Sequence, residues 1–160
     1  MRLDIACGRL PETALELNFA DAHPGLSPEQ AALEADRCFY CYDAPCVEAC
    51  PTDIDIPRFI KAIASDNLAG ASRTILQSNI LGGSCARVCP TEILCEQKCV
   101  HTAIEAHHAV RIGALQRFAT DWQMQQKTHP FQRAASTGKR VAVVGAGPAG
   151  LACAHRLAMH

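Results

Sequence analysis

The sequence predicts a mainly α-helical fold that continues, near its C-terminal end, into the first strand, loop and helix of an α/β domain. Two observations predict it. Apolar residues recur at helical spacing up to residue 127, and no alternating strand pattern occurs before residue 140. A valine-rich run and a glycine-rich loop then follow at residues 140–150. We therefore expect a helical domain at 1–127, a polar linker at 128–139 and an incomplete α/β domain at 140–160.

The expected helices begin with a short one at Glu12–Phe19. The next helix has a clear start, with Ser27 as the N-cap, Pro28 at the first helical position and Gln30 completing a capping box. This helix leads the chain directly to Cys38.

The later helices are predicted from the helical spacing of their apolar residues. Two of them are expected at Pro57–Ser65 and Leu68–Gln77. Thr91 is expected to cap a short helix that carries Cys95 and Cys99 on one face, because they are four residues apart. The last helix has the most regular stripe, formed by Leu115, Phe118, Ala119 and Trp122.

Eight of the ten cysteines lie in two blocks, and each block contains the run C-x3-C-P. Eight thiolates suit two centres with four ligands each. A proline after the last cysteine of a block is typical of bacterial ferredoxins, where that cysteine binds the other cluster. Four residues, where a ferredoxin has two, separate the second and third cysteines of the first block. The pattern predicts a helical ferredoxin-like domain with two [4Fe–4S] clusters. The blocks consist of Cys38, Cys41, Cys46 and Cys50, and of Cys85, Cys89, Cys95 and Cys99.

Disulfides and zinc are the alternative uses of these cysteines. The N-terminal residues show no apolar signal segment, so we expect a reducing, cytoplasmic setting in which structural disulfides are rare. Zinc would make the chain a zinc-stabilised protein-docking module, but zinc ligands usually come as two separated pairs. Cys7 and Cys153 lie outside both blocks and are interpreted as ordinary small residues.

Composition excludes several classes of function. The net charge is −1 and the basic residues are scattered, so we expect no nucleic-acid partner. No apolar run is long enough to span a membrane, and we expect no membrane partner. We identify no catalytic residue on this chain, since no acid–base pair or activated nucleophile is apparent. His101, His107 and His108 are expected at the surface, because the cysteines already fill both sites.

The run RVAVV at 140–144 predicts a buried strand that leads into GAGPAG. A strand, a G-x-G-x-x-G loop and a helix in this order form a dinucleotide site, in which the glycines allow a pyrophosphate to approach the helix N-terminus. The acidic residue that binds ribose would lie about 20 residues further on, so we expect the chain to be part of a longer oxidoreductase. The loop does not distinguish FAD from NAD(P). Its candidate residues are Gly145, Gly147, Pro148, Ala149 and Gly150.

Four motifs give the sequence a family resemblance. They are RCFYCYDAPC at 37–46, CPTDIDIP at 50–57, SCARVCPT at 84–91 and IGALQRF at 112–118. With the GAGPAG loop, they resemble the family of dihydropyrimidine dehydrogenase and the small subunit of bacterial glutamate synthase. The resemblance is closest to the flavin and iron–sulfur subunit of the bacterial NAD-dependent dihydropyrimidine dehydrogenase, and it covers roughly residues 30–155.

The resemblance also implies a ligand assignment. One cluster would be bound by Cys38, Cys41, Cys46 and Cys99. The other would be bound by Cys50, Cys89, Cys95 and, in place of a thiolate, Gln116. Cys85 would then bind neither cluster. The residues alone favour a solvated position for Gln116, because glutamine side chains are mostly exposed.

The function implied by the resemblance is electron transfer. In this family NAD(P)H reduces an FAD, and electrons pass through the clusters to a partner subunit. For the dihydropyrimidine dehydrogenase type, the partner is a catalytic subunit with FMN that interconverts uracil or thymine with the 5,6-dihydro form. The alternative within the same chemistry is the electron-transfer domain of a glutamate synthase small subunit.

Overall fold

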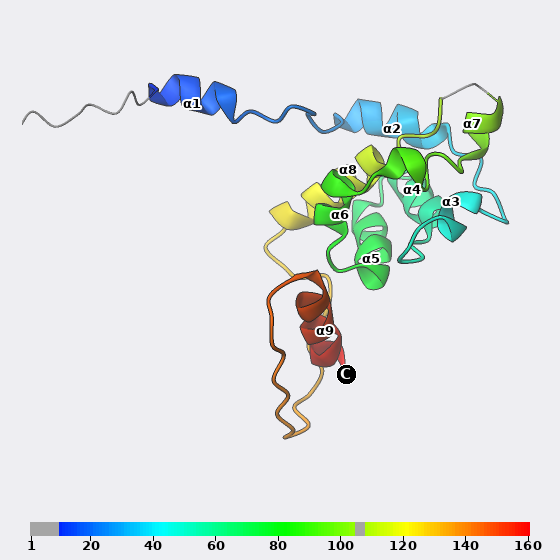
Figure 1. Cartoon of the computed structure of the whole chain (residues 1–160). Helices are drawn as coiled ribbons and strands as arrows, with labels where there is room; N and C mark the ends of the chain where they lie inside the picture. Colours follow the sequence, from blue (N-terminus) through cyan, green and yellow to red (C-terminus); the bar gives the residue numbers. More distant parts are fainter. Residues whose placement is uncertain (1–9, 105–107) are drawn as a thin grey trace, which may run out of the picture.

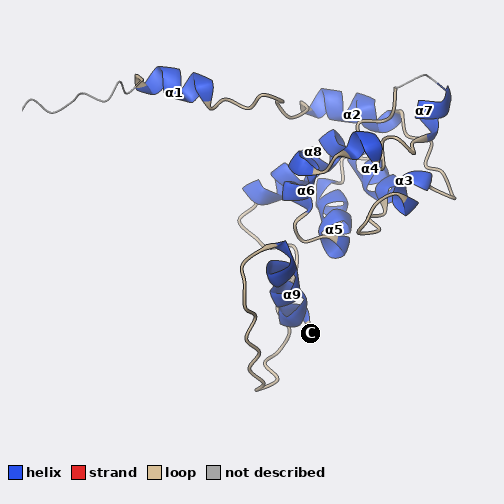
Figure 2. Cartoon of the chain, viewed as in Figure 1, coloured by secondary structure: helices blue, strands red, loops and turns tan. Residues whose placement is uncertain are grey.

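The computed structural model describes residues 10–104 and 108–160. Within these ranges the regular elements are all helical, and none of these residues is in a strand (Figure 2). Figure 1 shows the helices in chain order. They are α1 (Glu12–Asn18), α2 (Pro28–Asp36), α3 (Pro45–Glu48), α4 (Ile56–Ala64), α5 (Leu68–Ser78), α6 (Gly82–Val88), the 3-10 turn η1 (Thr91–Ile93), α7 (Val100–Ile104), α8 (Ile112–Gln125) and α9 (Pro148–Met159).

Helices α4, α5 and α8 form the centre of the domain. Helix α4 packs on α5, and α5 packs on α8, while α2 lies against α4 and α6 against α8 (Figure 1). Their apolar faces meet in a core in which each fully buried aliphatic or aromatic side chain contributes roughly 1.5–3 kcal/mol. The fully buried members of this core on α4, α5 and α8 are Phe59, Ile60, Ala71, Ile75, Leu115 and Ala119, and α2 adds Ala31 and Ala35.

The helix starts follow the local sequence. The Oγ of Ser27 accepts a hydrogen bond from the backbone N–H of Gln30, and the Gln30 side chain accepts one from the N–H of Ser27, as the capping box predicts. Asp55 caps α4 through the N–H of Arg58, 3.1 Å away. The expected helices near 12, 28, 57, 68 and 115 are therefore confirmed, with ends that shift by a few residues.

The segment around the second cysteine block differs from the prediction. The helix expected to carry Cys95 and Cys99 is wrong, because Thr91–Ile93 forms a 3-10 turn and residues 94–98 form further turns. The short helices α3, α6 and α7 were not predicted. Helices α3 and α6 carry Cys46 and Cys85, α7 directly follows Cys99, and all three are too short for their apolar periodicity to be read.

The C-terminal segment begins without the expected strand. Residues 139–146 have no regular structure, and the side chains of Val141 and Val144 are 65% and 99% exposed. A buried strand requires a neighbouring strand for its backbone hydrogen bonds, and none of the described residues supplies one. Helix α9 nevertheless forms after Gly147, which is its N-cap. Among the described residues, no helix has both the length and the apolar character needed to cross a membrane.

Candidate iron–sulfur centre

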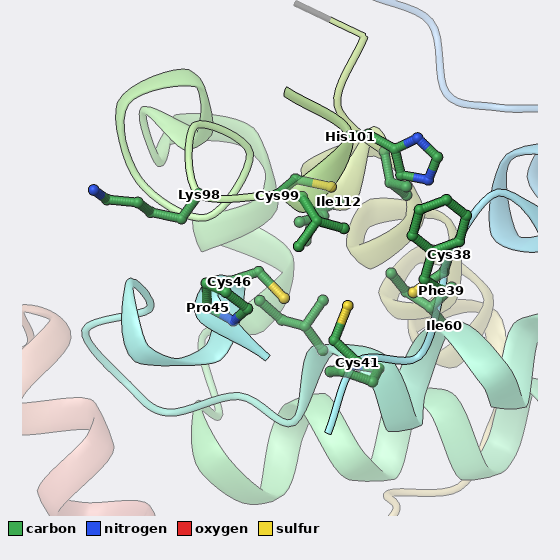
Figure 3. Close-up of a pocket in the computed structure, with 14 residues that line it drawn as sticks. Cys38, Phe39, Cys41, Pro45, Cys46, Ile60, Lys98, Cys99, His101 and Ile112 are labelled. Atoms are coloured by element: carbon green, nitrogen blue, oxygen red, sulfur yellow. The ribbon is translucent and has the colours of Figure 1, made fainter. Parts of the chain in front are cut away.

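One cavity is lined by four cysteines from both blocks, which we call the first site: Cys38, Cys41, Cys46 and Cys99. Figure 3 shows these side chains around the cavity, with the sulfurs of Cys41 and Cys46 directed into it. Ile56, Ile60 and Ile112 close it on the side of the helical core. The structure thus brings together the four residues that the resemblance assigned to one cluster.

Short elements position the thiols of the first site. Helix α2 ends at Asp36, and the N–H of Cys38 donates to the carbonyl of Ala35, so Cys38 directly continues the helix end. Tyr40 has a positive φ of 50°, which turns the chain sharply between Cys38 and Cys41. Cys46 lies in α3, which begins at Pro45.

Burial makes two thiols of the first site, those of Cys38 and Cys46, poor acids in the iron-free protein. Burial, together with the neighbouring Cys38 and Cys99, raises the pKa of the Cys46 thiol to about 12. Burial also raises the pKa of the Cys38 thiol, and the neighbouring Cys41 and Cys99 add to this rise. Thiolates are the form that binds iron, so a bound cationic cluster would replace the protons of these partly buried thiols.

A second group of cysteines, the second site, consists of Cys50, Cys85, Cys89 and Cys95. Burial raises the pKa of Cys95 to about 12, with contributions from Glu96, Cys50 and Cys89. Burial and then the nearby Cys85 and Cys50 raise the pKa of Cys89 to about 11. Cys89 thus interacts with Cys85 and Cys50, and Cys95 interacts with Cys50 and Cys89. Cys85 sits on α6, and Cys50 follows α3.

Gln116 lies on the buried face of α8, with only 7% of its surface exposed. Its side-chain N–H donates to the carbonyl of Gly82, the first residue of α6, at 2.8 Å. One turn earlier on α8, the N–H of Gly113 donates to the carboxylate of Glu96, beside Cys95. The solvated position expected from the residues alone is therefore wrong. Helix α8 thus contacts two of the segments that carry cysteines of the second site, α6 with Cys85 and the turns with Cys95.

The donor set suits iron–sulfur clusters. Each site offers several thiols, the first site lies in a largely apolar cavity, and cluster irons are held by thiolates. In residues 10–104 and 108–160, no three His, Cys, Asp or Glu side chains converge as they would on a single metal ion. A [4Fe–4S] cluster places each thiolate on a different iron, so its four sulfurs stand farther apart than those around one zinc ion.

One histidine departs from its expected place. His101 is buried, with 5% of its surface exposed, and its Nε2 lies 2.7 Å from the carbonyl oxygen of Arg37. Its ring also lines the cavity of the first site. The expectation of a surface position is thus wrong for His101 and correct for His108, which is exposed. His107 lies outside the described residues.

The glycine-rich loop has the backbone geometry that its sequence predicts. Gly145 has a φ of +102°, a conformation that favours glycine. A Cβ atom on Gly150 would lie 2.1 Å from the carbonyl oxygen of Gly145, so only glycine allows this close approach. A Cβ on Gly147 would meet nothing within 4 Å. The loop thus leaves open space at the N-terminus of α9, where a pyrophosphate would approach.

Comparison with known proteins agrees with this donor set. Residues 15–128 match the family described as dihydropyrimidine dehydrogenase domain II, 4Fe-4S cluster. The chain is 46% identical over 128 residues to the NAD-dependent dihydropyrimidine dehydrogenase subunit PreT of Salmonella typhimurium, covering 80% of this chain and 30% of that protein. For PreT of Escherichia coli K12, the identity is 45% over 128 residues, covering 80% of this chain and 31% of that protein.

A third relative has a different name. The chain is 38% identical over 143 residues to "Putative oxidoreductase UacF" of Escherichia coli K12, covering 88% of this chain and 22% of that protein. The chain thus spans less than a third of the length of these curated relatives. It belongs to the family of the dihydropyrimidine dehydrogenase 4Fe-4S cluster domain.

Proposed function

We propose that this chain holds two [4Fe–4S] clusters and passes electrons within a dihydropyrimidine dehydrogenase-like oxidoreductase. The observation that carries the proposal is the cavity of the first site, where three cysteines of the first block meet Cys99 of the second. We assign this cluster to Cys38, Cys41, Cys46 and Cys99. We assign the other to Cys50, Cys89, Cys95 and Gln116.

The exchange of ligands between the blocks keeps the two sites close. Cys46 and Cys50 bracket the end of the four-residue helix α3, yet they belong to different sites. Cys95 and Cys99 are also four residues apart, with turns between them, and they too belong to different sites. The bound clusters would supply one-electron steps along this short path. The protein contributes the apolar side chains that limit water, since solvent exposure is one of the terms that set cluster potentials.

The remaining steps belong to the longer protein that the relatives represent. The loop from Gly145 to Gly150 supports an FAD or NAD(P) site, because its glycines leave room for a pyrophosphate. The name of PreT supports NAD-dependent dihydropyrimidine dehydrogenase chemistry. We propose that NAD(P)H and FAD act in the full-length, cytoplasmic protein. A partner subunit with FMN would then act on uracil or thymine.

Two measurements test the proposal. Anaerobic analysis of the purified chain should give about eight iron and eight sulfide, as two [4Fe–4S] clusters require. Zinc without sulfide would overturn the iron–sulfur assignment. The full-length protein combined with its partner subunit should oxidise NADH or NADPH when uracil is added. If the protein carries clusters but uracil and thymine have no effect, the pyrimidine assignment is wrong.

A further inference from the structure

His101 connects the two cysteine blocks through contacts that are separate from those of the cluster ligands. Its Nε2 lies 2.7 Å from the carbonyl oxygen of Arg37. A carbonyl oxygen can only accept, so Nε2 carries the proton and donates it. The ring also stacks on Phe39, with 4.2 Å between the ring centroids and 33° between their planes. His101 therefore holds the two residues that flank Cys38.

Arg37 joins the same segments from the other side. Its guanidinium donates to the backbone carbonyls of His108 and, at 3.2 Å, Ala109. It also pairs with Glu34 of α2 at 2.7 Å. The end of α2 is thus attached to α7 through the Arg37 carbonyl at His101, and to the chain after α7 through the Arg37 side chain at residues 108–109.

These attachments lie beside the two cysteines that join the blocks. Cys38 directly follows Arg37, and Cys99 precedes His101 by two residues. Phe39 and His101 line the cavity together with both thiols (Figure 3). Cys99 is the one residue of the second block in this site. The hydrogen bond to Arg37 therefore sets where its segment lies relative to Cys38.

We propose that His101 is a positioning residue for the first cluster, which fixes Cys99 against Cys38 and covers the cluster with its ring. The inference rests on the proposed function. Hydrogen-bonded partners that orient metal ligands typically change metal affinity by about 10–100-fold when removed. Loss of the ring would also admit water, and water stabilises the more negatively charged reduced cluster. The potential of the first cluster should then rise, while the second cluster should keep its own.

Two substitutions separate the hydrogen bond from the ring. His101→Phe keeps an aromatic ring against Phe39 but removes the N–H donor. His101→Gln keeps a donor at a similar reach but removes the ring. His108→Phe is the matched control, because this histidine is exposed and Arg37 donates to its backbone carbonyl. Cys46→Ser and Cys95→Ser identify which electron paramagnetic resonance signal belongs to which site.

The experiment follows the loss of each signal from the anaerobically purified chain in the presence of an iron chelator, together with its midpoint potential. For His101→Phe we expect the first signal to disappear about tenfold faster than in the unsubstituted chain. In His101→Gln the first signal should be lost more slowly than in His101→Phe, and its midpoint potential should be higher than in the unsubstituted chain. The second signal should be unchanged in both variants.

Each outcome bears on one claim. If the unsubstituted chain contains no iron and sulfide, the proposed function fails before His101 is tested. If it carries both clusters and His101→Phe matches His108→Phe, the positioning role is wrong. Equal loss of both signals in His101→Phe would also overturn it, because the role is assigned to the first site alone.

Discussion

The side-chain N–H of Gln116 donates to the backbone carbonyl of Gly82 at 2.8 Å, and this bond joins α8 to the start of α6. Because the carbonyl accepts one N–H, the amide nitrogen lies towards Gly82, and the amide oxygen and the second N–H remain for other groups. We propose that this oxygen is the fourth ligand of the second cluster. Cys85, three residues after Gly82 on α6, offers the competing thiol.

Substitution distinguishes these two ligand candidates. We expect Gln116→Ala to leave an incomplete cluster at the second site and to lower stability by about 1–3 kcal/mol, because the carbonyl of Gly82 loses its buried partner. Cys85→Ser should keep both clusters. Iron content and electron paramagnetic resonance measure the outcome, with Gln125→Ala on the exposed face of α8 as the control. Loss of a cluster in Cys85→Ser, with both retained in Gln116→Ala, would favour an all-cysteine second site.

The raised thiol pKa values predict how the iron-free protein responds to alkali. The fully buried side chains between α4, α5 and α8 include no cysteine, so we expect the chelated protein to remain folded. The pKa of Cys46 is raised from 9.0 to about 12 in the folded state. Above pH 9 the unfolded chain therefore loses this proton first. This contribution to stability is present below pH 9 and is lost as the pH rises towards 12.

Thermal melting of the reduced, iron-free chain at several pH values between 7 and 11 tests whether stability falls as the pH rises. The melting temperature should fall with rising pH, and the fall should be shallower in Cys46→Ala. Cys153→Ala serves as the control, because this cysteine is exposed on α9. An identical slope in Cys46→Ala would contradict the assignment of the pH dependence to this thiol.

The sequence predicts those parts of the fold that depend on neighbours in the chain. Ser27 and Gln30 form their capping box three residues apart, and the motif alone identifies it. The ligands of the first cluster could be assigned only through the family resemblance, because it alone implies that Cys99 of the second block joins three cysteines of the first. His101 could not be found in this way, because its partner carbonyl is 64 residues away in the sequence. The run at 140–144 has strand-forming residues, but pairing decides whether a strand forms.

Gly82 and Gly83 show a second limit of the sequence. They follow the helix expected at Leu68–Gln77, and they begin α6. A Cβ on Gly82 would lie 2.5 Å from Cγ2 of Ile75, so glycine allows α6 to approach α5. This requirement depends on the packing of the two helices and is not visible in the local sequence.

The two glycines should respond differently to alanine. Gly82→Ala should lower the free energy of unfolding by about 1–3 kcal/mol, because Ile75 is fully buried and cannot move aside. At Gly83 the nearest atom is the terminal Cε of Met124, an exposed and flexible side chain. Gly83→Ala should therefore cost much less, since alanine also favours the helix by about 1 kcal/mol. Urea unfolding of both variants measures the difference, and equal losses would contradict it.

The segment between the helical domain and α9 is attached to α5 by Arg73. The guanidinium donates to the carbonyl of Pro130 at 2.7 Å and lies 5.2 Å from the centre of the Phe131 ring. That ring in turn lies 5.6 Å from His155 of α9. The polar composition of 128–139 predicts a linker, but the structure shows that part of it is anchored.

Arg73→Ala should release this anchor. The lost hydrogen bond and cation–π contact together are worth about 1–2 kcal/mol, which increases opening of the segment by about tenfold. Limited digestion with trypsin, followed by mass spectrometry, should show correspondingly faster cleavage after Lys127 and Arg133. Arg73→Lys should be intermediate, because lysine keeps the charge but not the planar guanidinium. Arg58→Ala, an exposed arginine on α4, is the control. Cleavage at the same rate in Arg73→Ala and Arg58→Ala would show that other contacts hold the segment in place.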